Sequence, residues 1–200
     1  MDDAVLASLQ RWPNVPAVYG WLSLDARGRW RLHPVGDAAR GGPGESVTSP
    51  QIIAFINRNY ERDDAGRWFF QNGPQRVYVR LDAAPYVLRF ADEGGLITHT
   101  GLPVTHVRQW LLDDEGRLLA DTDRGPGVVD HRELLAVIDW LQDDAGRSLA
   151  DLLEAPLDAH AALHAVDGSL AKAGLAAIAA ADIPTRLGFI AHPCAPPPAA

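Results

Sequence analysis

The clearest structural signal in the sequence is RWFFQNGPQRVYVRL, residues 67–81. Its first part, Arg67 to Gln71, is mainly aromatic, and its last part, Arg76 to Leu81, alternates strictly between polar and apolar side chains. Between them, Asn72-Gly73-Pro74-Gln75 contains Asn-Gly, a dipeptide that favours a tight turn between antiparallel strands. The segment therefore predicts a β-hairpin.

Hairpin signals continue on both sides of this segment. Upstream, Val18 to Leu24 and Arg29 to His33 alternate around a turn at 25–28. If Leu24 lies opposite Arg29, one buried face holds Tyr19, Trp21, Trp30 and Leu32. Downstream, further turns are predicted at 82–85, 92–95, 101–103 and 113–116. The pattern predicts one curved antiparallel sheet of roughly seven to nine strands.

Helices are predicted at three places around this sheet. Ser49-Pro50 combines an N-cap hydroxyl with proline at the first helical position, and the apolar stripe after it extends the helix over 50–61. Asp130 and Glu133 have the spacing of a capping box for a helix over 131–141. The Ala-rich end of the chain predicts short helices near 149–154, 159–166 and 169–181, then an extended stretch over 187–191.

The fold class is therefore α+β, and 200 residues fit one domain. We expect residues 1–147 to form the antiparallel sheet with its two helices. Residues 148–200 are expected to form a helical extension that ends in a Pro-rich tail.

Composition argues against several partners. The chain carries a net charge of −8 and has no basic stripe, so binding to nucleic acid or to an anionic membrane is not expected. It has no apolar run close to the roughly 20 residues that span a bilayer. The start, MDDAVLASLQRW, is acidic and lacks the basic region of a secretory signal, so a cytoplasmic protein is expected.

One phrase occurs four times, as Asp-x-x-Gly-Arg ending at Arg29, Arg67, Arg117 and Arg147. The copies are unevenly spaced, which argues against a solenoid or propeller. Turn chemistry explains them, because aspartate favours the first position of a turn and glycine the position with positive φ. The last copy follows a predicted helix, so Gly146 is expected to be its C-cap.

Histidines are the first place to look for a metal. His160 and His164 are four residues apart on a predicted helix, and His99 and His106 flank a tight turn. Either pair could supply two ligands, but a zinc site needs at least a third. The single cysteine, Cys194, lies near the Pro-rich end. We therefore expect no metal and no cofactor.

Sequence motifs for catalysis are absent as well. The chain has no Gly-x-Ser-x-Gly elbow, and no Gly-x-Gly-x-x-Gly that would indicate a dinucleotide cofactor. No Ser/His/Asp trio can be chosen from the order of residues alone. We therefore assign no catalytic residue.

The hairpin turn itself is the best candidate for binding. Its polar side chains exceed what an Asn-Gly turn requires, and they would suit a polar ligand or the backbone of a partner. The predicted binding residues are Gln71, Asn72, Gln75, Arg76 and Tyr78. The alternative is that Gln71 and Gln75 only satisfy the end of the sheet.

Three segments also resemble a known family: RWPNVPAVYGWL at 11–22, NRNY at 57–60 and FQNGPQRVYV at 70–79. Together they are similar to a family of uncharacterised, mostly proteobacterial proteins of unknown function. The resemblance covers most of residues 10–145. It implies no activity, cofactor or catalytic residue.

These observations favour a non-enzymatic binding or assembly module of the bacterial cytoplasm. Its partner would be a protein or a small polar ligand, and a homodimer is a further option. The alternative is a small hydrolase with a histidine-containing polar pocket, which would need three convergent His, Asp or Glu side chains.

Overall fold

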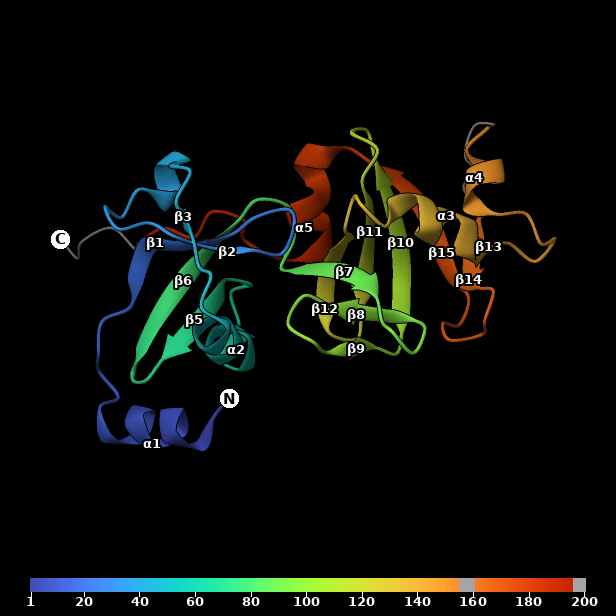
Figure 1. Cartoon of the computed structure of the whole chain (residues 1–200). Coiled ribbons are helices and arrows are strands. Elements are labelled where there is room, and N and C mark those ends of the chain that lie inside the picture. Colours follow the sequence, from blue (N-terminus) through green and yellow to red (C-terminus); the bar gives the residue numbers. More distant parts are fainter. Residues whose placement is uncertain (155–160, 196–200) are drawn as a thin grey trace. The chain divides into compact units, whose positions relative to one another are not determined.

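The computed structural model describes residues 1–154 and 161–195, which form two compact units. Unit 1 is Met1–Ala83 with Gly188–Ala200, and unit 2 is Ala84–Leu187. Each unit contains a mixed β-sheet and short helices, so the predicted α+β class is confirmed (Figure 1). Two compact units of one chain can still unfold together, so the single domain stays a prediction.

Unit 1 is built on a six-stranded sheet with the order β3-β2-β1-β6-β5-β4. Its elements are α1 (Asp3–Arg11), β1 (Val18–Leu24), β2 (Trp30–Leu32), η1 (Ala38–Arg40), β3 (Glu45–Ser46), α2 (Pro50–Arg58), β4 (Tyr60–Arg62), β5 (Trp68–Asn72) and β6 (Gln75–Leu81). Helix α2 begins at the predicted residue and packs on β5. It ends three residues earlier than expected, because Tyr60 to Arg62 pair with β5 as β4.

The predicted hairpin at the centre of this sheet is confirmed. Strands β5 and β6 are antiparallel, with Phe70 opposite Val77 and Asn72 opposite Gln75. Gly73 has a φ of 56°, a backbone conformation that glycine adopts without strain.

The hairpin of β1 and β2 has a different register from the predicted one. Leu24 lies opposite Trp30, and Leu22 lies opposite Leu32. Because the shift is one residue, it moves side chains to the other face of the sheet. Trp30 is buried with Leu22 and Leu24, whereas Trp21 is half exposed, so the predicted face of Tyr19, Trp21, Trp30 and Leu32 is wrong.

Strand β1 also pairs with β6, and this pairing is parallel. Its register shifts between Val18 and Leu22, so three residues of β1 lie opposite the single residue Tyr78. Gly20 occupies this bulge with a φ of 82°, and a Cβ there would lie 2.7 Å from the carbonyl oxygen of Gly36. Only glycine fits this position without moving the backbone.

The four Asp-x-x-Gly-Arg phrases form four loops with the same hydrogen bonds. In each loop one carboxylate oxygen accepts from the backbone N–H groups two and four residues later, and the other accepts from Nε of the arginine. The turn explanation agrees with this geometry. Gly146 is not a C-cap, because its helix ends at Trp140 and Gly146 lies in the fourth loop.

Unit 2 contains a nine-stranded sheet with the order β13-β14-β15-β10-β11-β12-β7-β8-β9. Its elements are β7 (Tyr86–Phe90), β8 (Leu96–Thr98), β9 (Pro103–Val104), β10 (Val107–Asp113), β11 (Leu118–Thr122), β12 (Gly125–Val129), α3 (Leu134–Trp140), β13 (Leu141–Gln142), α4 (Leu149–Leu152), β14 (Ala162–Ala165), β15 (Ala173–Ile178), η2 (Ala180–Asp182) and α5 (Ile183–Leu187). Its buried residues include Trp110, Leu111, Leu118 and Leu119.

The end of this unit differs most from expectation. The helices predicted at 159–166 and 169–181 are not formed: the structure has β14 and β15 within these ranges, and residues 155–160 lie outside the described chain. Strand β15 pairs in parallel with β10, where Ala173 and Leu175 are buried on alternating positions. Tertiary pairing outweighed the helix propensity of alanine at this strand.

Helix α3 also begins later than predicted, at Leu134. Asp130 and Glu133 do not form the expected capping box. The carboxylate of Glu133 accepts from the backbone N–H of Phe90, and Asp130 pairs with Arg89 and Arg132. Among the described helices, none is long and apolar enough to cross a membrane.

Candidate functional site

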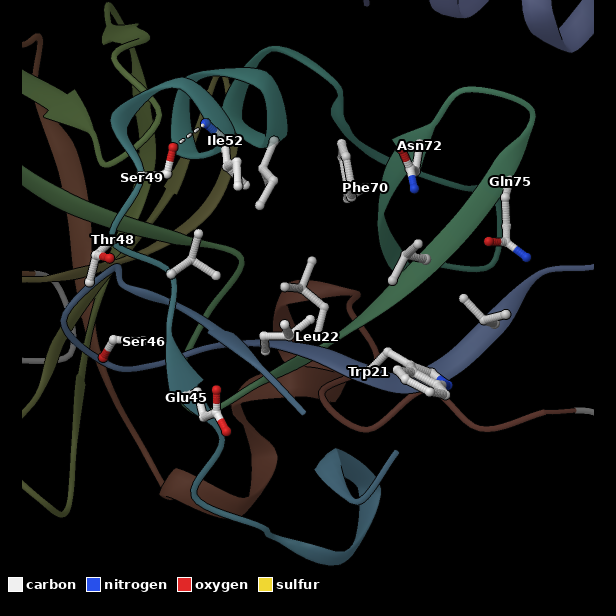
Figure 2. Close-up of a pocket in the computed structure, with 15 residues that line it drawn as sticks. Trp21, Leu22, Glu45, Ser46, Thr48, Ser49, Ile52, Phe70, Asn72 and Gln75 are labelled. Atoms are coloured by element: carbon white, nitrogen blue, oxygen red, sulfur yellow. Dashed lines mark hydrogen bonds between the residues drawn. The ribbon is translucent and has the colours of Figure 1, made fainter. Parts of the chain in front are cut away.

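Unit 1 has a pocket of about 620 Å³ on one face of the six-stranded sheet (Figure 2). Strands β1, β2, β5 and β6, helix α2 and the segment 45–49 enclose it. Its volume falls in the range of small-molecule sites. Its lining residues are Val18, Trp21, Leu22, Leu32, Glu45, Ser46, Val47, Thr48, Ser49, Ile52, Ile56, Phe70, Asn72, Gln75 and Val77.

Helix α2 forms one wall of this pocket, and its start fixes the wall's position. The hydroxyl of Ser49 accepts from the backbone N–H of Ile52, and Pro50 occupies the first helical turn. Ile52 and Ile56 are four residues apart, so they lie on the same face of the helix. Ile56 is buried against the sheet, whereas Ile52 lies nearer the helix start and is exposed.

The floor of the pocket follows from strand register. Phe70 and Val77 are partners across β5 and β6, and Val77 is also the partner of Val18 on β1. Side chains of paired residues lie on the same face of a sheet, so these three apolar residues gather there. The ring of Phe55 on α2 contacts Phe70 edge to face, with the ring centres 5.5 Å apart.

Three large apolar side chains stay exposed around this floor. Trp21 and Leu32 are each 45% exposed, and Ile52 is 52% exposed. Single exposed apolar residues are ordinary on a protein surface. Three of them around one concave space are instead typical of a surface that a ligand or partner covers.

Polar groups lie at two ends of the pocket. Asn72 and Gln75 stand together at one end, and Glu45, Ser46 and Thr48 lie across the floor from them in Figure 2. The Nε2 of Gln75 donates to the carbonyl oxygen of Pro16 at 3.2 Å. Glu45 is the charged residue of the lining, and it is exposed.

Strand alternation divides the five predicted binding residues between two faces. Asn72 and Gln75 line the pocket, whereas Gln71, Arg76 and Tyr78 lie on the opposite face of the sheet. Gln71 is fully buried, and its Nε2 donates to the carbonyl oxygen of Gly73. Their joint role in binding stays a prediction, but they do not form one surface.

The other two residues of that opposite face have partners within unit 1. The guanidinium of Arg76 lies over the ring of Phe69, 4.5 Å from its centre. Tyr78 is buried and donates from its hydroxyl to Asp63 at 2.9 Å. Burial raises the pKa of Tyr78, and its hydrogen bond to the Asp63 carboxylate adds to this shift.

A Ser–His–Asp chain of hydrogen bonds also lies in unit 1. Oγ of Ser23 is 2.9 Å from Nε2 of His33, and Nδ1 of His33 is 3.0 Å from Oδ1 of Asp37. This order of groups is that of a serine nucleophile with its base. Ser23 and His33 are both fully buried, however, and neither lines the pocket. These two hydrogen bonds therefore attach the 33–37 loop to β1. Because Ser23 is buried, a substrate has no path to its hydroxyl.

The histidines considered as metal ligands are spread over unit 2. His99 follows β8, where its Nδ1 accepts from the backbone N–H of Val87 at 3.2 Å, and His106 is exposed between β9 and β10. His164 lies in β14, and His160 lies outside the described residues. Within residues 1–154 and 161–195, no group of three or more potential metal ligands occurs. The absence of a metal stays a prediction.

Sequence reasoning missed the apolar lining of the pocket. Trp21, Leu32 and Ile52 look like core residues, because hydrophobic periodicity shows which face is apolar but not what covers it. One wall of the pocket could be predicted in part, because the N-cap at Ser49 indicates where α2 begins.

Comparisons with known proteins give a family without an assigned function. A family model described as "Protein of unknown function (DUF2946)" matches residues 1–194. No curated protein matches the chain. The resemblance to an uncharacterised family is confirmed.

Two solved structures are similar to part of the chain. One is a DUF1285 family protein from Silicibacter pomeroyi DSS-3, with 16% identity and a TM-score of 0.44, over 71% of this chain and 86% of that one. The other is a DUF1285 family protein from Shewanella baltica OS155, with 18% identity and a TM-score of 0.42, over 66% of this chain and 97% of that one.

Proposed function

Because this chain belongs to a family without an assigned activity, Protein of unknown function (DUF2946), we propose its function from the pocket: it is a non-enzymatic binding module for a small, mainly apolar ligand. One observation carries the proposal. Three large apolar side chains, Trp21, Leu32 and Ile52, stay exposed around one concave space of about 620 Å³.

The energy available at this surface supports binding. Covering apolar surface gains about 25 cal/mol per Å², so a ligand that covers about 100 Å² of the lining gains about 2.5 kcal/mol from the protein side alone. The ligand's own apolar surface adds to this gain. The walls are paired strands and a capped helix, so little ordering is needed on binding.

The chemistry of the lining supports binding over catalysis. A hydrolase needs a positioned base or nucleophile beside its substrate. The pocket is lined by one carboxylate, Glu45, and by hydroxyl and amide side chains, with no histidine among its lining residues. The Ser23–His33 pair is fully buried and does not line this pocket.

A neutral fluorescent probe tests the proposal. N-phenyl-1-naphthylamine brightens in apolar sites, and we expect saturable binding with one site per chain. Ile52→Asn should weaken this binding at least fivefold, because it puts an amide where the probe covers an apolar side chain. The helix itself should persist, since isoleucine and asparagine have similar helix propensities.

Ile190→Asn is the matched control. Ile190 belongs to the same unit, is 40% exposed and does not line the pocket. Its replacement should leave probe affinity unchanged. The proposal fails if the folded wild-type protein does not bind the probe saturably, or if both variants lose the same affinity. Sedimentation with and without probe would show whether a second copy of the chain fills the pocket instead.

A further inference from the structure

The charged residue of the pocket is placed by the pairing of β2 and β3. Glu45 lies opposite Leu32, so the two side chains share one face of the sheet. That face is the pocket, because both residues line it. Among the described residues, Glu45 forms no ion pair, so the pocket presents a carboxylate beside an exposed leucine.

Arg31, the arginine of β2, does not pair with Glu45 but binds other groups. Arg31 lies opposite Ser46, one position along from Glu45, and its guanidinium donates to the Ser46 hydroxyl. The same guanidinium donates to the carbonyl oxygens of Pro43 and Gly44 at 3.1–3.3 Å. Successive side chains on a strand point to opposite faces, so Arg31 leaves the carboxylate of Glu45 available.

We infer that the ligand of this pocket is a cationic amphiphile, whose amine pairs with Glu45 while its apolar part covers Leu32 and Ile52. The inference rests on the proposed function and adds the charge of the ligand. A carboxylate ligand would meet the like charge of Glu45 and no arginine or lysine of the lining. A neutral alcohol would gain the apolar contact without the ion pair.

The expected preference is modest because Glu45 is exposed. Ion pairs at exposed positions contribute little, which corresponds to a preference of about two- to fivefold for an amine over an alcohol of the same chain length. This preference should shrink as salt is added, because salt screens exposed charges. Octanoate should bind more weakly than octanol.

The test is displacement of N-phenyl-1-naphthylamine at pH 7 by octylamine, 1-octanol and octanoate. Octylamine is protonated at this pH, as a lysine side chain is. Glu45→Gln should remove the roughly two- to fivefold preference for octylamine over octanol, with each competitor compared at the probe affinity measured for that variant. Glu93→Gln removes the same charge from an exposed turn of unit 2, and it should keep the preference for the amine.

The outcomes separate the two proposals. If the probe binds but octanoate competes as well as octylamine, or if Glu93→Gln also removes the preference, the pairing with Glu45 is wrong and the binding function stands. If the probe itself fails to bind, both proposals are wrong.

Discussion

The hydroxyl of Tyr78 donates a hydrogen bond of 2.9 Å to Oδ2 of Asp63. Asp63 begins one of the four Asp-x-x-Gly-Arg loops, and Tyr78 lies in the middle of β6. The guanidinium of Arg67 from the same loop lies over the Tyr78 ring, 4.7 Å from its centre. Tyr19 stacks on this ring with a centre-to-centre distance of 4.6 Å. A loop formed by local bonds is thus tied to the centre of the sheet.

This hydrogen bond predicts that replacing tyrosine with phenylalanine lowers stability more at Tyr78 than at Tyr19. Tyr78→Phe should lower the free energy of unfolding by about 1 kcal/mol, because it removes a buried hydrogen bond. Tyr19→Phe keeps the stacked ring and should change stability by less than about 0.5 kcal/mol. Denaturant unfolding of both variants measures the difference, and a loss below about 0.5 kcal/mol for Tyr78→Phe would contradict the contribution assigned to its hydroxyl.

Acid should destabilise unit 2 through Asp130. Burial raises the pKa of Asp130, but hydrogen bonds from Arg132 and Arg89 outweigh this and hold it well below its ordinary value of 3.8. A carboxyl whose pKa is lowered by folding stabilises the protein fully above its unfolded pKa and loses this contribution as the pH falls through the folded value. Wild type should therefore lose stability below about pH 4.

A comparison of Asp130→Asn with wild type should measure how much the Asp130 carboxylate contributes to stability. The variant should be less stable than wild type at pH 7, because Arg89 and Arg132 lose their charged partner. The gap should narrow as the pH falls below about 4, because the unfolded wild-type chain then takes up a proton at Asp130 that the folded protein does not yet bind. Unfolding of each protein across this range gives the gap, with Asp92→Asn at an exposed turn as the control for losing one charge. A gap that stays constant with pH would contradict the assignment.

Replacing glycine with alanine should destabilise the protein more at Gly20 than at Gly101, although the two residues have similar φ angles. Gly101 has a φ of 89° and open space where a Cβ would lie, so Gly101→Ala should cost about 1–2 kcal/mol from backbone strain alone. Gly20 has a φ of 82°, and its Cβ would meet the backbone of Gly36 at 2.7 Å. Gly20→Ala should cost at least about 1 kcal/mol more, because the close backbone must move. Thermal and denaturant unfolding of the two variants check the order.

Substitutions of Gln75 and Arg76 should have different effects, because the two side chains lie on opposite faces of the sheet. Gln75→Ala should weaken probe binding, because Gln75 closes one end of the pocket. Arg76→Ala should leave probe affinity unchanged and cost about 0.5–1 kcal/mol of stability from its contact with Phe69. Titration of the probe into both variants gives the comparison. An effect of Arg76→Ala on affinity equal to that of Gln75→Ala would mean that the predicted recognition loop acts as one surface after all.

Turns, one helix start and short loops could be predicted from the sequence. The Asn-Gly hairpin turn, the start of α2 at Ser49-Pro50 and the four Asp-x-x-Gly-Arg loops all form between residues a few positions apart. Each depends on turn or cap chemistry that the participating residues carry in any fold. The α+β class followed from these signals, and so did the alternation that places Val77 and Arg76 on opposite faces of β6.

The contacts between distant segments could not be predicted from the sequence and are visible only in the folded chain. The register of β1 with β2 depends on a one-residue choice, and the parallel pairings of β1 with β6 and of β15 with β10 join segments more than 50 residues apart. Packing between elements also decided that Trp21, Leu32 and Ile52 surround an open pocket. Hydrophobic periodicity selects an apolar face, but whether a neighbour buries that face depends on packing between distant parts of the chain.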